Sequence, residues 1–228
     1  MRLNAWIAEL IGTFAVCFMG VGAILVASQP GSGSGLVEIA LAQGLAYAVC
    51  VTAFAPVSGG HLNPAVTLGA WVANRIQLLP ALGYIVAQCL GAVAALATLR
   101  AAVGIVNLEN VEFGIPALRT GITAMGGIVL EAVATFFLAT AYLLTAVDRR
   151  APKLGGLVVG FAVVMGILAT ASFTGGCLNP ARYLGSAVVA ANFIDVVVYL
   201  AGPILGGAVA AVLAGSFGQT SAPEPPAS

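Results

Sequence analysis

Charged residues are scarce in this sequence. Only 7% of its 228 residues are Asp, Glu, Lys or Arg, and the formal net charge is zero. A soluble domain carries about 25% charged residues, so this composition excludes an ordinary soluble enzyme. A neutral chain also offers no basic surface for nucleic acid. With 61% hydrophobic residues and a mean hydropathy of +1.08, the chain is typical of proteins that cross a bilayer several times.

Histidine and cysteine are also sparse. His61 is the only histidine, and no nucleophile–base constellation accompanies it, so the sequence predicts no enzyme. The four cysteines form no CxxC pair, and we interpret them as small buried side chains. We therefore expect no disulfide, no metal and no cofactor. The N-terminal stretch lacks the cleavage site of a secretory signal, which predicts a retained first span.

Six apolar stretches are long enough to cross a bilayer, which takes about 20 residues. They lie at 6–27, 36–56, 80–101, 121–146, 154–172 and 194–216. Two shorter apolar stretches, at about 63–73 and 179–190, cannot span and are predicted to be re-entrant half-helices. The fold class we expect is an all-α membrane protein with six transmembrane helices and two half-helices.

One short motif occurs twice, 116 residues apart (179 − 63). The copies are Gly-Gly-His-Leu-Asn-Pro-Ala at 59–65 and Gly-Gly-Cys-Leu-Asn-Pro-Ala at 175–181. Proline is tolerated in the first helical turn, so each Asn-Pro pair predicts a helix that begins there. Lipid permits such a break only where protein buries it or where it lines a water-filled cavity. The two copies therefore predict a polar site deep in the membrane.

The two halves of the chain match outside this motif as well. The stretch Glu-Leu-Ile-Gly-Thr-Phe at 9–14 resembles Glu-Ala-Val-Ala-Thr-Phe at 131–136. Each half holds three spans and one half-helix, and an odd number of spans gives the halves opposite orientations. We therefore expect an inverted repeat, with halves of about 1–110 and 118–218 in one domain over 1–218. Such repeats place their functional site near the bilayer midplane.

Asn63 and Asn179 stand at the start of the two predicted half-helices. A helix N-terminus carries a partial positive charge of about half an elementary charge. Half-helices that enter from opposite faces would bring both positive ends to the midplane, where they repel cations, including hydronium. The two side-chain amides would then donate to the oxygen of one small neutral molecule. A single Asn-Pro pair is more simply explained by a kink, but two matched copies favour a pore.

Basic residues predict the orientation. One side carries Arg2, Arg75, Lys153 and the Asp-Arg-Arg run at 148–150, and we expect this side, with both termini, to be cytoplasmic. A Pro/Ser-rich tail at 219–228 is predicted to be disordered. Arginine outnumbers lysine seven to one, and alanine, glycine and valine abound. That composition favours a bacterial source, and hence a bacterial inner membrane.

We call the two Asn-Pro-Ala copies, at 63–65 and 179–181, the boxes. With both boxes and Arg182 after the second, the chain resembles the aquaporins of the major intrinsic protein family over residues 5–216. The resemblance implies a passive channel that conducts water and excludes protons and ions. It also implies a homotetramer in lipid, with one pore in each protomer. Its central constriction is assigned to Asn63, Pro64, Ala65, Asn179, Pro180 and Ala181. Pore-lining backbone is assigned to Gly59, Gly60, His61, Gly175 and Cys177.

Glu9 and Glu131 lie in apolar spans, where carboxylates are costly. One interpretation is a proton relay. The other, which the resemblance favours, is that each braces the loop before a half-helix. His61 is interpreted as a loop-bracing side chain, with pH sensing as the alternative. Cys177 is interpreted as a packing residue, with a pore-facing thiol that binds soft metals as the alternative.

Positions counted from the boxes give a selectivity filter of Gln43, Ile167, Gly176 and Arg182 by resemblance. Water channels of the family usually carry phenylalanine and histidine at the first two positions, and this chain has neither. Glycerol channels usually carry aspartate after the arginine, where this chain has Tyr183. The Ile-Gly-Arg part is similar to members that pass ammonia, and the Gln43 amide offers both a donor and an acceptor.

We therefore expect water and small neutral solutes, such as ammonia and hydrogen peroxide, to pass. A facilitator of glycerol or metalloid hydroxides is the alternative within the family. A secondary transporter with inverted repeats is the alternative from another class. It would need a charged coupling site, for which this chain has few intramembrane charges.

Overall fold

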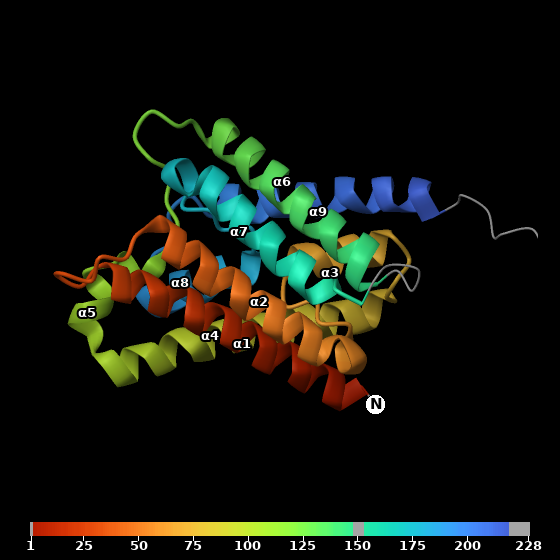
Figure 1. The fold of residues 1–228 in the computed structure, drawn as a ribbon, viewed down its shortest axis with the longest axis horizontal. Helices are drawn as coiled ribbons and strands as arrows, with labels where there is room; N and C mark the ends of the chain where they lie inside the picture. Colours follow the sequence, from red (N-terminus) through yellow and green to blue (C-terminus); the bar gives the residue numbers. More distant parts are fainter. Residues whose placement is uncertain (1, 148–152, 219–228) are drawn as a thin grey trace, which may run out of the picture.

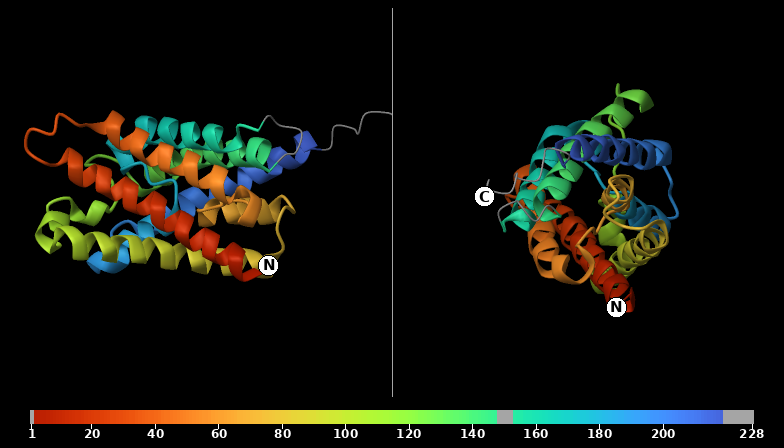
Figure 2. Two further views of the ribbon diagram at one scale, coloured as in Figure 1. Left: turned by 60° about the horizontal axis from the view of Figure 1, so that its bottom comes forward. Right: turned by 90° about the vertical axis from the view of Figure 1, so that its right-hand side faces the viewer.

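The protein is all-helical over the residues that the structure, a computed structural model, describes: 2–147 and 153–218. The six helices that are long and apolar enough to cross a membrane are α1 Arg2–Ala27, α2 Leu36–Ser58, α4 Leu78–Val103, α6 Ala124–Ala141, α7 Gly155–Thr174 and α9 Val196–Gly218. They run side by side along the long axis of the molecule (Figure 2). The six predicted spans are confirmed, with ends within five residues of those predicted.

Two short helices, α3 Pro64–Val72 and α8 Pro180–Ala190, lie inside this bundle. They occupy opposite ends of the molecule in Figure 1, α8 towards the left and α3 towards the right. Their N-termini point inward, because Asn63 and Asn179 contact the opposite loop. This is the predicted arrangement of two re-entrant half-helices in an inverted repeat.

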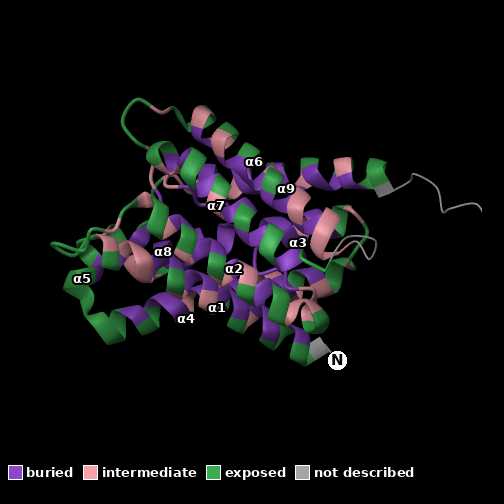
Figure 3. Ribbon diagram, in the orientation of Figure 1, coloured by how far each residue is buried: buried purple, intermediate pink, exposed green. Residues whose placement is uncertain are grey.

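The outer surface of the helices is apolar. Large side chains such as Leu, Val, Phe and Met are exposed along every long helix, and exposed positions follow the outward faces (Figure 3). The polar side chains that are buried instead face the interior, near the half-helices. An apolar exterior of this extent belongs in lipid, which explains why hydropathy alone located the spans.

Small residues let the long helices cross closely. A Cβ built at Gly91 of α4 would overlap the Leu10 carbonyl of α1, and one at Gly206 of α9 would overlap the Ala132 carbonyl of α6. The two contacts are equivalent in the two halves. Each fixes the helix that carries a buried glutamate against the helix that closes its half.

The start of α1 and the end of α9 lie towards the same end of the molecule (Figures 1 and 2). The predicted basic run at 148–150 and the predicted tail at 219–228 lie outside the described residues. Sequence patterns missed α5 Ile105–Glu109 and the 3-10 turn η1 Glu112–Gly114, which are too short for a periodicity to register. The chain after α6 continues as a π-helical turn, η2 Tyr142–Ala146.

Candidate functional site: the paired half-helix starts

The two asparagines cap their own helices and reach the opposite half. Asn63 Oδ1 accepts from the Ala65 N–H at 2.9 Å, and Asn179 Oδ1 accepts from the Ala181 N–H at 2.9 Å. Proline at the next position supplies no N–H, as expected at a helix start. Because each Oδ1 faces a backbone donor, each amide NH2 points away from its own helix.

Those NH2 groups join the two halves. Asn63 Nδ2 donates to the Leu178 carbonyl at 2.8 Å, and Asn179 Nδ2 donates to the Leu62 carbonyl at 3.0 Å. We call these two bonds the asparagine cross-tie. Asn179 Nδ2 also donates to the Tyr47 hydroxyl at 2.6 Å. The expectation that both amides point at one solute oxygen is therefore wrong for Asn179, whose two amide hydrogens are both used within the protein.

Unusual backbone at two leucines supports the cross-tie. Leu62 and Leu178 have φ of 54° and 56°, in the left-handed region that leucine rarely adopts. Their side chains fit because Gly12 and Gly166 have no side chain; a Cβ at Gly12 would overlap Leu62, and one at Gly166 would overlap Leu178. Such strain gathers at sites where the surrounding structure holds it. Here the hydrogen bond that each leucine carbonyl accepts from an asparagine offsets the backbone strain.

Glu9 anchors the loop of the first half. It is fully buried, and its carboxylate accepts from the Ser58 hydroxyl at 2.6 Å, the His61 N–H at 2.9 Å and the Leu62 N–H at 2.7 Å. A fourth bond comes from Gln88 Nε2 at 2.8 Å. Hydrogen bonds to a charged acceptor are among the stronger ones, at about 1.5–3 kcal/mol. These contacts brace the loop. None of them is to a second titratable side chain that could pass a proton on.

Glu131 makes the equivalent contacts in the second half. It is fully buried and accepts from the Thr174 hydroxyl at 2.6 Å, the Cys177 N–H at 3.0 Å and the Leu178 N–H at 2.8 Å. Each glutamate thus holds the two backbone N–H groups that precede its asparagine.

The loop residues next to the boxes are packed in different ways. The His61 ring lies between Tyr84 and Tyr142, with ring centroids 5.1 and 5.3 Å away, and its Nδ1 is buried with no hydrogen-bond partner in the described chain. The Cys177 thiol is buried and donates to the Asn179 carbonyl at 3.3 Å. Both residues also donate their backbone N–H to a glutamate, so both are fixed within the loop framework.

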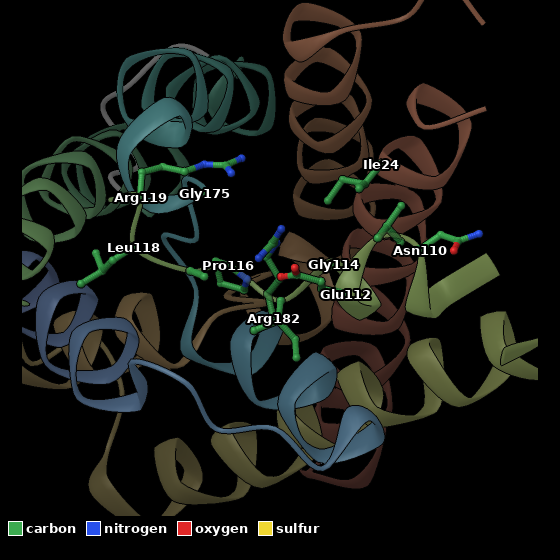
Figure 4. A pocket seen from close by; sticks show the side chains of 12 residues that line it. Ile24, Asn110, Glu112, Gly114, Pro116, Leu118, Arg119, Gly175 and Arg182 are labelled. Carbon is green, nitrogen blue, oxygen red and sulfur yellow. The ribbon is translucent and has the colours of Figure 1, made fainter. Parts of the chain in front are cut away.

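Arg182 lies at an outer cavity of about 350 Å³. The cavity is lined by Ile24, Gly175, Arg182 and the segment between α5 and α6, which contributes Glu112 and Arg119 (Figure 4). Arg182 is 4% exposed, and its Nε and Nη1 are buried without a hydrogen-bond partner in the part of the chain that the structure describes. Buried guanidinium N–H groups are normally paired, so two unpaired donors on one side chain are unusual.

The other predicted filter residues are buried around the same region but do not line this cavity. Gln43 of α2 lies against Gly20 of α1, where a built Cβ would come within 2.8 Å of its Oε1. Ile167 of α7 is buried, and Gly176 packs against it, with a built Cβ 3.1 Å from the Ile167 Cα. The Gln43 amide makes no hydrogen bond to any residue that the structure describes.

Sequence reasoning missed three kinds of residue. Ser58 and Thr174 each donate to a glutamate, and their common spacing from the boxes, 116 residues apart, was a signal that could have found them. Gln88 links Glu9 to Thr67 and has no counterpart signal in the sequence. Tyr47 was missed as well, because only the folded chain brings it to Asn179.

Comparisons with known proteins agree with this arrangement. A family model described as "Major intrinsic protein" matches residues 1–214. The chain belongs to this family. A probable aquaporin TIP2-2 of Arabidopsis thaliana is 40% identical over 233 residues, covering 98% of this chain and 91% of the relative. The aquaporin FA-CHIP of Pelophylax lessonae is 38% identical, covering 92% and 80%.

A solved structure, of the aquaglyceroporin from Plasmodium falciparum, matches with a TM-score of 0.83 and 27% identity, covering 93% of this chain and 95% of the other. The chain is thus an integral, multi-pass membrane protein and a channel for water and small solutes, not an enzyme. Family membership also removes the secondary transporter as an alternative. The relatives named here come from a plant, a frog and a parasite, and they give no support to the predicted bacterial inner membrane.

Proposed function

We propose that this channel conducts water together with ammonia and hydrogen peroxide, and that it excludes protons and other cations. The observation that carries the proposal is Arg182, whose Nε and Nη1 are buried and unpaired beside the outer cavity. A fixed positive charge there repels cations, while a guanidinium that lines the cavity can donate to the oxygen or nitrogen lone pair of a neutral solute.

The filter positions favour solutes somewhat larger than water. Gln43 is folded against Gly20, and Gly176 has no side chain, so neither supplies the bulk of an aromatic residue. The Gln43 amide, with no partner in the described chain, can both donate and accept. Ammonia, water and hydrogen peroxide share that dual hydrogen-bonding character. A facilitator of glycerol or metalloid hydroxides is the alternative within the family, and the similarity to the aquaglyceroporin from Plasmodium falciparum supports it.

The assembly and orientation belong to the same proposal. Every long helix has an apolar outer surface, against which a second copy of the chain can pack within lipid. The proposed assembly has four copies, with one pore in each. The two ends of the described chain lie on one side, which we assign to the cytoplasm from Arg75 and Lys153. The outer cavity then opens on the opposite side.

Flux measurements on proteoliposomes test the proposal. Wild-type vesicles should pass water, ammonia and hydrogen peroxide faster than lipid alone, without saturation, and should pass no protons. The double variant Gln43→Phe/Ile167→His restores a narrow filter, so ammonia and peroxide flux should fall more than water flux. Wild-type vesicles that pass water but neither ammonia, peroxide nor glycerol would overturn the wide filter. Selective glycerol flux would favour the alternative.

A further inference from the structure

Tyr47 occupies a position that the two boxes alone do not explain. It lies on α2, one turn after Gln43, so the two side chains share a helix face. Its side chain is 2% exposed and crosses from the first half to the second, where the hydroxyl accepts from Asn179 Nδ2 at 2.6 Å. The atom that faces Tyr47 is the amide nitrogen, because Asn179 Oδ1 is engaged by the Ala181 N–H.

The other tyrosines show what a structural hydroxyl does in this protein. The chain has five tyrosines, and the other four donate to backbone carbonyls, at Ser58, Gly59, Ile194 and Thr174. Tyr47 instead accepts from a side-chain amide of the central constriction. Its own hydroxyl hydrogen has no acceptor among the residues that the structure describes. Unlike the other four hydroxyls, that of Tyr47 is therefore not tied to a backbone carbonyl.

The amide hydrogens of Asn63 and Asn179 are used differently. Asn179 uses one hydrogen in the cross-tie and the other on Tyr47. Asn63 uses one in the cross-tie, and its second has no partner in the described chain. The Tyr47 oxygen therefore stands where a passing solute would accept from Asn179. A solute meets one free N–H of Asn63 and one free O–H of Tyr47.

We propose that Tyr47 is a specificity-determining residue of the central constriction, and that its hydroxyl takes the place of a permeating water at Asn179. This inference rests on the channel function proposed above. A solute that binds Asn179 must first displace the phenol, so each passage replaces one neutral hydrogen bond. Solutes that both donate and accept can make that exchange, whereas purely apolar molecules cannot.

Removal of one hydroxyl tests the inference. Tyr47→Phe keeps the buried ring and frees the second Asn179 hydrogen, so water flux per protein should rise about two- to tenfold, the range expected for loss of one neutral hydrogen bond. The temperature dependence of the flux should become shallower. Tyr183→Phe is the matched control, because it also removes a single tyrosine hydroxyl, one that donates to the Ile194 carbonyl. Its flux should equal that of wild type.

The outcomes separate this inference from the channel function. If wild type conducts and Tyr47→Phe conducts equally or less, Tyr47 does not limit passage, while the channel function stands. If wild type is silent and Tyr47→Phe conducts, the inference about Tyr47 is supported, while the proposed conduction by wild type is overturned. If wild type, Tyr47→Phe and Tyr47→Leu all match bare lipid, both are overturned. Tyr47→Leu serves as the second variant should Tyr47→Phe fail to fold, and it should likewise raise flux.

Discussion

The loop of the first half is held by more side chains than the loop of the second. Glu9 accepts four hydrogen bonds, one of them from Gln88, which also donates to Thr67, whereas Glu131 accepts three. The second half carries the charged and crowded side of the constriction instead. Its half-helix bears Arg182 where the first bears Val66, and Asn179, unlike Asn63, is bound to a tyrosine.

Most bonds that the halves share involve backbone groups, whereas the bonds of Gln88 and Tyr47, found in one half alone, join side chains. Shared bonds include the two caps, the cross-tie and the pairs of N–H groups on each glutamate. Duplicated contacts thus hold the two half-helices together, and the side chains present in one copy only distinguish the halves. Matched pairs of variants, one in each half, test this division.

The largest effect should come from the helix crossings. Gly91→Leu and Gly206→Leu each place a side chain on a backbone carbonyl that has nowhere to move, at a cost of about 3 kcal/mol or more. Both should abolish monodisperse protein in mild detergent. Gly22→Leu is the control, because a Cβ there meets nothing within 4 Å. If only one of Gly91→Leu and Gly206→Leu folded normally, the α1–α4 and α6–α9 crossings would not be equivalent.

The next largest effect concerns the buried glutamates. In Glu9→Gln or Glu131→Gln the new NH2 faces a backbone N–H in either orientation, which leaves a buried donor unpaired at a cost of about 1–3 kcal/mol. Both variants should melt earlier in detergent, and Glu9→Gln more so because four donors converge there. The exposed Glu109→Gln should melt like wild type.

Transport by the folded fraction separates bracing from a proton relay. A brace lowers yield and melting temperature but leaves flux per folded channel near the wild-type level. Well-folded Glu9→Gln that conducts no water would contradict the bracing role. That result would restore the relay interpretation for the first half alone.

An intermediate effect is expected at the position where the half-helices differ in charge. Arg182→Val makes the second half-helix like the first and removes the fixed cation. Two like charges 4 Å apart repel by about 4 kcal/mol at an effective dielectric of 20. Proton or cation leak should therefore rise at least about tenfold, since each 1.4 kcal/mol is tenfold.

A pH-sensitive dye inside proteoliposomes measures that leak. Arg75→Gln, on an exposed loop at the other end of the molecule, should leave the vesicles as tight as wild type. Unchanged tightness in Arg182→Val would assign cation exclusion to the half-helix N-termini, which both halves share.

The smallest effect should be chemical block at Cys177, which stands where the first half has His61. Its thiol is 1% exposed and donates to the Asn179 carbonyl, so a mercurial should react slowly and block only partly. Cys177→Ser should remove the block, and Cys50→Ser should not. Block that persists in Cys177→Ser would move the site to another cysteine.

The sequence was most informative where chemistry repeats. Two Asn-Pro pairs and six apolar stretches were enough to predict the half-helices and spans, because lipid forbids most other backbone arrangements. The same logic pointed to Glu9 and Glu131. It failed at Tyr47, which is an ordinary apolar-helix residue until folding brings it to Asn179. It also failed for the direction of the asparagine amides, since the cross-tie depends on contacts between halves rather than on spacing within one.

The cross-tie has a consequence for the order in which the protein is made. Its bonds join residues 115 and 117 positions apart, so the Asn63 NH2 group and the Leu62 carbonyl lack their cross-tie partners until the second half has been synthesised and inserted. Closing contacts of such long sequence separation is slow. The centre of the channel is therefore the last part to form during biogenesis, and a chain arrested after its first half holds unpaired polar groups within the membrane. Such intermediates are natural substrates for quality control.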